Sequence, residues 1–102
     1  MCGRFALTIH PRLLAELFGL AVIPAEMPAR YNIAPSKPVA AIVAQESSGG
    51  RELWWLRWGL IPHWAKEESM GRKLINARAE TVVEKPAFRE AYRMRRCLIP
   101  AD

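Results

Sequence analysis

The sequence predicts an α+β fold built on a curved, mainly antiparallel sheet with short helices. Apolar stretches of strand length alternate with clusters of glycine, proline and serine, a pattern typical of strands joined by turns. Helical periodicity is confined to short stretches, which proline opens and glycine or polar residues end. Because strands that follow one another through short turns pair in antiparallel fashion, we expect the sheet to be mainly antiparallel.

The first part of the chain begins with an extended segment over residues 2–8. A helix is expected to open at Pro11, because proline fits the first helical position, and to continue through an apolar face. Gly19 is expected to end it, since glycine readily adopts the left-handed backbone found after a helix. Residues 21–38 are rich in proline and are expected to be extended.

The middle of the chain predicts a β-hairpin. Residues 39–44 and 52–58 are apolar strands, and the Ser-Ser-Gly-Gly stretch at 47–50 is the turn between them. Gly59 and Pro62 end the second strand. The remaining elements are expected to be a polar loop over 63–72, a short strand over 74–77, a helical turn near Glu80, a helix over 85–92 and a last strand over 96–100.

A chain of 102 residues fits one small domain and is too short for two. The last expected strand, residues 96–100, stands almost at the end of the sequence. An apolar strand needs neighbours to bury its side chains and pair its edges. We therefore expect residues 1–102 to form a single domain that is truncated on its C-terminal side, with the edge at 96–100 left open or covered by a missing half or by another chain.

The sequence lacks the signals of membrane or secreted proteins. No apolar run approaches the roughly 18 residues of a membrane span, and the N-terminus carries no basic segment followed by an apolar one. We expect a cytoplasmic protein, or a nuclear one in a eukaryote, with no membrane partner.

The chain carries a net charge of +5, which favours polyanionic partners such as nucleic acids. Part of the charge lies near the C-terminus, at Arg89, Arg93, Arg95 and Arg96. This cluster has two interpretations, a phosphate-binding surface or an ordinary solvated helix face.

The two cysteines, Cys2 and Cys97, have neither the spacing of a metal site nor that of a disulfide framework. We expect no metal and no small-molecule cofactor. Cys97 lies in an apolar run and is expected to be a buried, inert thiol.

Cys2 directly follows the initiator methionine, and removal of Met1 would leave a free α-amine beside a thiol. With a reference pKa of about 7.7–8.0, a substantial fraction of the amine is neutral near physiological pH, and the thiol is strongly nucleophilic. An aldehyde can condense with such an amine to a Schiff base that the sulfur closes into a thiazolidine ring. The alternative is an ordinary residue at a frayed terminus.

Five short motifs stand in order along the chain. They are Met-Cys-Gly-Arg-Phe at 1–5, Tyr-Asn-Ile-Ala-Pro at 31–35, Trp-Gly-Leu-Ile-Pro-His-Trp at 58–64, Ile-Asn-Ala-Arg-Ala-Glu-Thr at 75–81 and Arg-Cys-Leu-Ile-Pro at 96–100. Each is weak alone, but together the sequence resembles the SOS response-associated peptidase (SRAP) family from Met1 to Asp102.

The resemblance implies a role in the DNA damage response, with single-stranded DNA that contains abasic sites as the partner. It implies a partial SRAP β-barrel-like fold and a thiazolidine crosslink between an N-terminal cysteine and the ring-opened abasic sugar. Carried over by motif, Cys2 is the nucleophile and Asn76 positions the reacting groups. The implied DNA contacts are Arg4, Arg78, Trp64, Pro35 and Asn32, where the arginines hold phosphates, and Trp64 and Pro35 pack against a base.

Three further residues have competing interpretations. Trp58 is expected in the core rather than facing a ligand. Asn32, listed among the DNA contacts, can instead brace a turn with its side chain. Glu80 can organise a phosphate-binding loop or pair with Arg78, and we favour the pair.

The resemblance also places a catalytic glutamate and a histidine of the family beyond Asp102. His10 and His63 do not match that histidine. Crosslinking without these groups is expected to be slower, because positioned acid-base catalysis typically contributes about 10²–10⁴-fold.

Two other functions remain open. An N-terminal thiol can act as a peptidase or autopeptidase, as the family name suggests, although only Met1 precedes Cys2 and no leader needs removal. A truncated chain can also be a non-catalytic single-stranded nucleic-acid-binding fragment.

Overall fold

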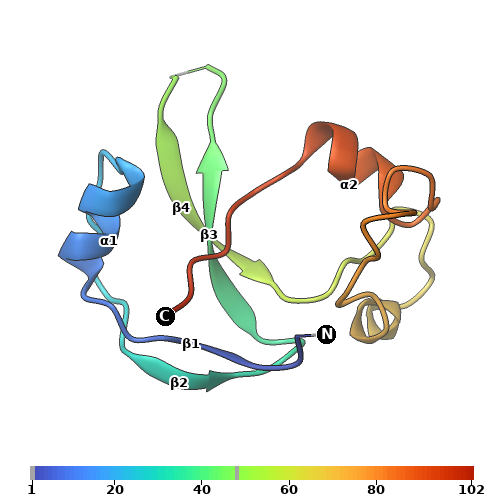
Figure 1. Ribbon diagram of the computed structural model, residues 1–102, viewed down its shortest axis with the longest axis horizontal. Helices are drawn as coiled ribbons and strands as arrows, with labels where there is room; N and C mark the ends of the chain where they lie inside the picture. Colours follow the sequence, from blue (N-terminus) through green and yellow to red (C-terminus); the bar gives the residue numbers. More distant parts are fainter. Residues whose placement is uncertain (1, 48) are drawn as a thin grey trace.

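The computed structural model describes residues 2–47 and 49–102, and it contains two separate antiparallel sheets of two strands each (Figure 1). Strand β1 (Phe5–Leu7) pairs with β2 (Arg30–Ile33), and β3 (Pro38–Ala44) pairs with β4 (Arg51–Arg57). The expected α+β class is confirmed. The expectation of one curved sheet is wrong, and the described residues form no closed barrel.

The two sheets separate at the turn between β2 and β3. Ser36 adopts a left-handed backbone, with φ of 74°, and the amide of Lys37 donates to the carbonyl of Ala34 at 3.3 Å. Two backbone hydrogen bonds then hold this turn against the end of the hairpin, from Ser36 N to Trp58 O at 2.9 Å and from Trp58 N to Lys37 O at 3.0 Å. The chain therefore changes direction at Ser36 before the second sheet begins.

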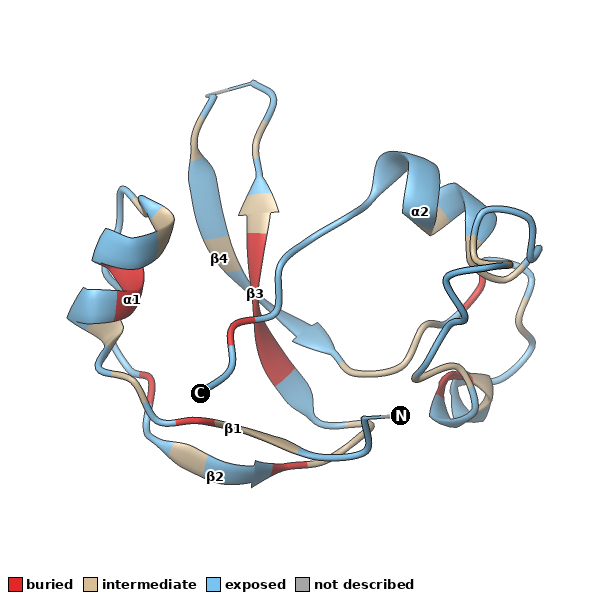
Figure 2. Cartoon of the chain, in the orientation of Figure 1, coloured by how far each residue is buried: buried red, intermediate tan, exposed pale blue. Residues whose placement is uncertain are grey.

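The β3–β4 hairpin agrees closely with the expectation from the sequence. The strands pair without a break from Pro38 opposite Arg57 to Ala44 opposite Arg51. Val39, Ala40, Ala41 and Ile42 are buried, whereas most of β4 is exposed. In Figure 2 the longest buried stretch lies along β3, with shorter buried stretches in β1, β2, α1 and the loops.

Helix α1 (Pro11–Phe18) begins and ends as the sequence predicts. The Nδ1 atom of His10 accepts a hydrogen bond from the amide of Arg12 at 3.1 Å and caps the N-terminus. Gly19 follows the helix with φ of 65°, which is the left-handed conformation expected of a C-terminal glycine. Leu14 and Ala15 are buried and anchor the helix.

The hydrophobic core lies where α1, β1, β2 and β3 meet. Its buried members are Leu7, Leu14, Met27, Ile33, Val39 and Ala40, with Phe5, Ile9, Phe18, Leu53 and Trp58 packed around them. No residue after Trp58 belongs to this cluster in the described part of the chain. The first half of the chain therefore carries the core, and the second half lies against it.

The second half differs from the expectation in several elements. The polar loop contains a 3-10 helix, η1 (Glu68–Arg72), and residues 74–77 form no strand. Helix α2 (Arg89–Met94) begins later than expected, because residues 86–88 form a turn. Backbone hydrogen bonds nevertheless run from residue 78 to residue 95 with helical spacing, so this segment is an irregular helical ribbon that includes the turn expected near Glu80.

The expected last strand, residues 96–100, is reduced to a single bridge. Leu98 pairs with Ile42 of β3 through Ile42 N to Leu98 O at 2.8 Å and Leu98 N to Ile42 O at 3.1 Å. Pro100 lacks the amide hydrogen needed to extend this ladder. The chain then reaches β1, where Asp102 donates from its amide to Ala6 O at 2.9 Å. This segment thus contacts both sheets.

No helix among the described residues is long and apolar enough to cross a membrane.

Candidate functional site

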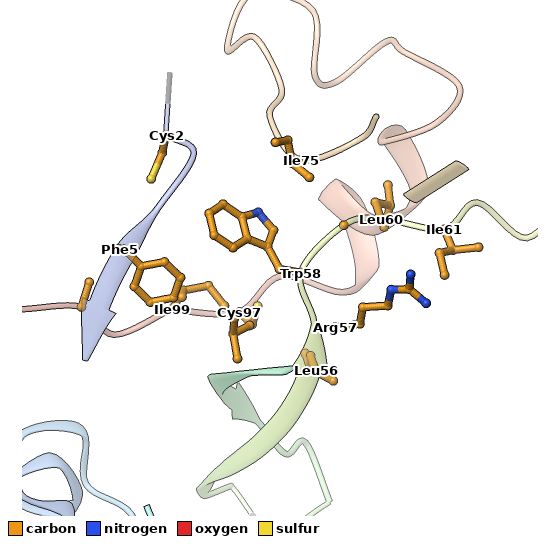
Figure 3. A pocket seen from close by; sticks show the side chains of 13 residues that line it. Cys2, Phe5, Leu56, Arg57, Trp58, Leu60, Ile61, Ile75, Cys97 and Ile99 are labelled. Atoms are coloured by element: carbon orange, nitrogen blue, oxygen red, sulfur yellow. The ribbon is translucent and has the colours of Figure 1, made fainter. Parts of the chain in front are cut away.

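Cys2 lines a cavity of about 570 Å³ that opens between β1, the end of β4 and the C-terminal segment. We call it the cysteine pocket and define it by Cys2, Phe5, Trp58, Ile75, Cys97 and Ile99, which Figure 3 shows around one hollow. Arg57 is the one charged residue among its described lining residues, and the rest of the wall is apolar, glycine or cysteine. The candidate nucleophile is therefore exposed to solvent beside an apolar wall.

Local contacts place Cys2 at this wall. Its Sγ atom lies 3.5 Å from the carbonyl oxygen of Arg4, and β1 begins at the next residue, Phe5. The Phe5 and Trp58 rings meet edge to face, with centroids 5.4 Å apart. Such a pair contributes about 0.5–1.5 kcal/mol beyond its buried area. It joins the strand that follows Cys2 to the end of β4.

A close approach of two glycines supports the opposite wall. Gly59 has φ of 126°, and a Cβ atom there would overlap the carbonyl oxygen of Gly71. The loop after β4 can therefore lie directly against η1 only if residue 59 is glycine. Leu60 donates from its amide to Leu74 O at 3.0 Å, which brings Ile75 into the cysteine pocket.

Asn76 and Arg78 line a second, smaller cavity of about 290 Å³. We call it the arginine hollow and define it by Asn76, Ala77, Arg78, Thr81, Lys85 and Phe88. Its two cationic side chains, one hydroxyl and one amide offer donors to an anion, and Phe88 adds an aromatic wall.

The helical ribbon explains why these residues share one hollow. Val82 N donates to Arg78 O at 2.9 Å and Lys85 N donates to Thr81 O at 2.9 Å, so the backbone turns as a helix does. Residues three and four apart in such a turn lie on the same face. The spacing from Arg78 through Thr81 and Lys85 to Phe88 fits this rule.

Cys2 and Asn76, which the family resemblance assigns to one reaction, line different cavities. Ile75 lines the cysteine pocket with Cys2, and the next residue, Asn76, lines the arginine hollow. The two cavities are thus linked by consecutive residues of one segment. The structure therefore places Cys2 in an apolar cavity and Asn76 in a separate, polar one.

The other N-terminal candidates cluster near Cys2. Arg4 Nη1 lies 3.5 Å from Asn32 Oδ1 on β2, so Asn32 contacts the arginine rather than bracing a turn with its side chain. Pro35 is half-buried in the turn that precedes β3. Arg4 and Asn32 are both exposed, which leaves their polar atoms accessible to a ligand.

Two of the tryptophans, Trp58 and Trp64, lie in different surroundings. Trp58 packs against the core, as expected, and also lines the cysteine pocket. Trp64 is 49% exposed and belongs to neither cavity.

The favoured ion pair between Glu80 and Arg78 is wrong. The ion pairs of the described residues are Arg57–Glu68 at 3.1 Å, His63–Glu90 at 3.7 Å and Arg95–Glu90 at 3.9 Å. Residues two apart on a helical turn do not face each other, which explains why Glu80 does not reach Arg78.

The C-terminal arginines are all exposed. Arg96 lies over the ring of Tyr92 at 4.7 Å from its centroid, and Arg95 pairs with Glu90. These contacts at the C-terminal end of α2 fit the interpretation of a solvated helix face.

Cys97 is exposed rather than buried, because the segment around it forms a bridge on one side and leaves the other side open. Partial burial in the cysteine pocket still raises the pKa of its thiol. Among the described residues, no group of three or more histidine, cysteine or acidic side chains could hold a metal ion.

The profile of the SOS response associated peptidase (SRAP) family matches residues 1–102. The chain belongs to the SRAP family. It is 47% identical over 104 residues to the abasic site processing protein YoaM of Bacillus subtilis, and 29% identical over 82 residues to the abasic site processing protein HMCES of Rattus norvegicus. These matches cover 100% and 71% of this chain and 45% and 23% of the two relatives.

A solved crystal structure has a similar arrangement of the chain. The crystal structure of a protein from Bordetella bronchiseptica is 29% identical and superposes with a TM-score of 0.76, covering 99% of this chain and 48% of that one. The chain therefore spans about half the length of YoaM and of the Bordetella protein.

Several lining residues were not singled out from the sequence. Lys85, Thr81 and Phe88 could have been found from their helical spacing to Arg78. Phe5 and Ile75 belong to the motifs at 1–5 and 75–81, but their place in the pocket depends on a contact between distant segments that no local pattern reveals.

Proposed function

We propose that this chain takes part in abasic-site processing, by binding single-stranded DNA and forming a thiazolidine crosslink through Cys2. The observation that supports it most is the position of Cys2, which is exposed and lines the cysteine pocket. Ile75 lines the same pocket, and the next residue in the sequence, Asn76, lines the cationic arginine hollow. Relatives of the SRAP family that carry the name abasic site processing protein add independent support.

The reaction requires the α-amine that removal of Met1 exposes on Cys2. The amine attacks the aldehyde carbon of the ring-opened sugar and expels water, which gives an imine. The thiol sulfur then adds to the imine carbon, its proton passes to nitrogen, and the five-membered ring closes. The net change is addition of the aldehyde with loss of one water, so no oxidant, metal or cofactor is needed.

The polar hollow supplies the DNA contacts in this proposal. Arg78 and Lys85 are free to hold a phosphate, because neither has an ion-pair partner among the described residues. Asn76 stands at the junction with the cysteine pocket, where an amide can hold a hydroxyl of the opened sugar. Arg4, which contacts Asn32, approaches the same DNA strand from the side of Cys2.

Stacking completes the proposed interface. Trp64 is exposed on the loop after β4 and can pack against an unpaired base, as single-strand binding proteins do. Pro35 lies in the turn beside the end of β4 and offers a second apolar contact. We propose that the protein works in the compartment that holds DNA, the bacterial cytoplasm or the eukaryotic nucleus.

The test is adduct formation on single-stranded DNA with one abasic site, resolved on a denaturing gel. Cys2→Ala is expected to abolish the adduct, and Cys2→Ser to give at most a weaker one, since oxygen is the poorer trap. Cys97→Ala is the matched control and is expected to react normally. A form that retains Met1 is expected to fail like Cys2→Ala, and a normal adduct from that form would contradict the thiazolidine mechanism.

A further inference from the structure

The cysteine pocket is more apolar than a DNA-backbone site requires. An abasic sugar brings hydroxyl and phosphate groups, yet the wall beside Cys2 is built from Phe5, Trp58, Ile75, Ile99 and similar residues. Figure 3 shows the indole of Trp58 projecting into the space between Cys2, Phe5 and Ile75. The polar groups suited to a nucleotide lie in the arginine hollow instead.

We propose that the cysteine pocket also captures small free aldehydes, with a preference for saturated alkyl and aryl ones. The inference rests on the thiazolidine chemistry of the proposed function, but it needs no DNA. An aldehyde whose chain or ring lies against Trp58 and Ile75 would hold its carbonyl carbon near the amine and thiol of Cys2. A small alkyl or aryl aldehyde fits within a cavity of about 570 Å³.

The covalent balance is the same as for the abasic sugar. The amine nitrogen bonds to the carbonyl carbon, the oxygen leaves as water, and the sulfur adds to the imine carbon while its proton moves to nitrogen. The product is a thiazolidine that carries the alkyl or aryl group, heavier than the protein by the aldehyde less one water.

Cys97, the second thiol of the pocket, cannot give this product. A thiazolidine needs an amine on the carbon next to the one that bears sulfur, and the nitrogen of Cys97 is an amide within the chain. Using saturated aldehydes also avoids direct addition of either thiol to a double bond. Lysine side chains give imines of the same added mass, so the part of the mass change that is absent from a Cys2→Ala variant is the part that reports on Cys2.

The experiment compares the protein without Met1 with a free peptide of residues 2–7, which has the same terminal amine and thiol but no pocket. Each is incubated with 3-phenylpropanal or with glyceraldehyde, and thiazolidine formation is followed by intact mass. The ratio of protein rate to peptide rate removes the intrinsic reactivity of each aldehyde. We expect this ratio to be about tenfold or more higher for 3-phenylpropanal, because its phenyl group is buried in the pocket.

A matched pair of variants tests whether the pocket wall causes the preference for 3-phenylpropanal. Ile99→Asp places a charge in the pocket wall at a residue that is 45% exposed, whereas Ile23→Asp changes the same residue type at 49% exposure outside the pocket. We expect Ile99→Asp to lose the preference for 3-phenylpropanal, and Ile23→Asp to keep it. Melting curves of both variants show that each is folded.

The outcomes separate this inference from the proposed function. Equal rate ratios for the two aldehydes, or an unchanged preference in a folded Ile99→Asp variant, would overturn the apolar capture site and leave DNA crosslinking intact. No thiazolidine with any aldehyde, together with a normal adduct on abasic DNA, would also overturn it. Loss of the DNA adduct as well would contradict the proposed function itself.

Discussion

The cysteine pocket and the arginine hollow differ in almost every physical property, although consecutive residues line them. The first is about 570 Å³, apolar and built by contacts between distant parts of the chain. The second is about 290 Å³, cationic and built almost wholly by one helical ribbon. The difference shows that Cys2 and the cationic side chains Arg78 and Lys85 are held by separate parts of the fold, joined at Ile75 and Asn76.

This division has a physical advantage for the proposed chemistry. Phosphate contacts position a strand but carry no information about a missing base. An apolar wall beside Cys2 favours a dehydrated imine over hydrated forms of the bound aldehyde. A DNA strand anchored in the arginine hollow could therefore present an opened sugar to Cys2 without bringing its phosphates into the apolar pocket.

The largest expected effect concerns the support of the cysteine pocket. Gly59→Ala should lower the free energy of unfolding by roughly 2–4 kcal/mol, because it adds backbone strain at φ of 126° and a clash with Gly71. Gly3→Ala is the control, since a Cβ atom there meets nothing within 4 Å. Urea denaturation of both variants measures the difference. Equal stability of the two variants would show that the loop can move away from η1.

The next effect tests whether stacking lies outside both cavities. Trp64→Ala should weaken binding to single-stranded DNA by about 1–3 kcal/mol, with little change in salt dependence. Trp55→Ala removes a ring of similar exposure, 46% against 49%, from β4 and should leave binding unchanged. Fluorescence anisotropy with a labelled oligonucleotide measures both affinities. A lower melting temperature in Trp64→Ala without weaker binding would assign that ring to the core.

A smaller effect tests the arginine hollow. Arg78→Ala should lower the slope of log affinity against log salt by about 0.7, because one phosphate contact to a single strand is lost. Arg93→Ala, an exposed arginine of α2 outside the hollow, should leave the slope unchanged. Titrations at several salt concentrations compare the two. An equal reduction in both variants would extend the DNA contact to the C-terminal arginines and remove the special role of the hollow.

The smallest effect concerns the thiol of Cys97, the second cysteine of the cysteine pocket. Burial raises the pKa of Cys97 above its ordinary value of 9.0, so the folded state disfavours the thiolate. The associated stability is fully present below the ordinary pKa and is lost as the pH rises through the raised one. Alkylation of Cys97 should therefore be several-fold slower in the folded protein than in urea. Equal rates in the two states would contradict this burial.

The sequence predicted elements that local signals define. Helix α1 has a proline at its start and a left-handed glycine after it, and the β3–β4 hairpin has two apolar runs with a turn between them. Local signals were insufficient where pairing depends on distant partners. The separation of the two sheets at Ser36, the single bridge at Leu98 and the contact of Asp102 with β1 are of this kind.

The candidate site shows the same limit. The motifs around Cys2, Asn76 and Arg78 could be recognised along the chain, and the resemblance to the SRAP family is confirmed over residues 1–102. The division of these residues between two cavities could not be predicted, because it depends on the Gly59–Gly71 approach and on the Phe5–Trp58 contact. The roles of the individual residues stay predictions.

The most direct test of the two-cavity account is to map the adduct formed with abasic single-stranded DNA. Intact mass before incubation shows whether Met1 is removed, and the mass afterwards shows whether one oligonucleotide less one water is added. Proteolysis then locates the modified residue. The account predicts a single adduct on Cys2 in the apolar pocket. An adduct on Lys85 of the arginine hollow, or on Cys97, would contradict it.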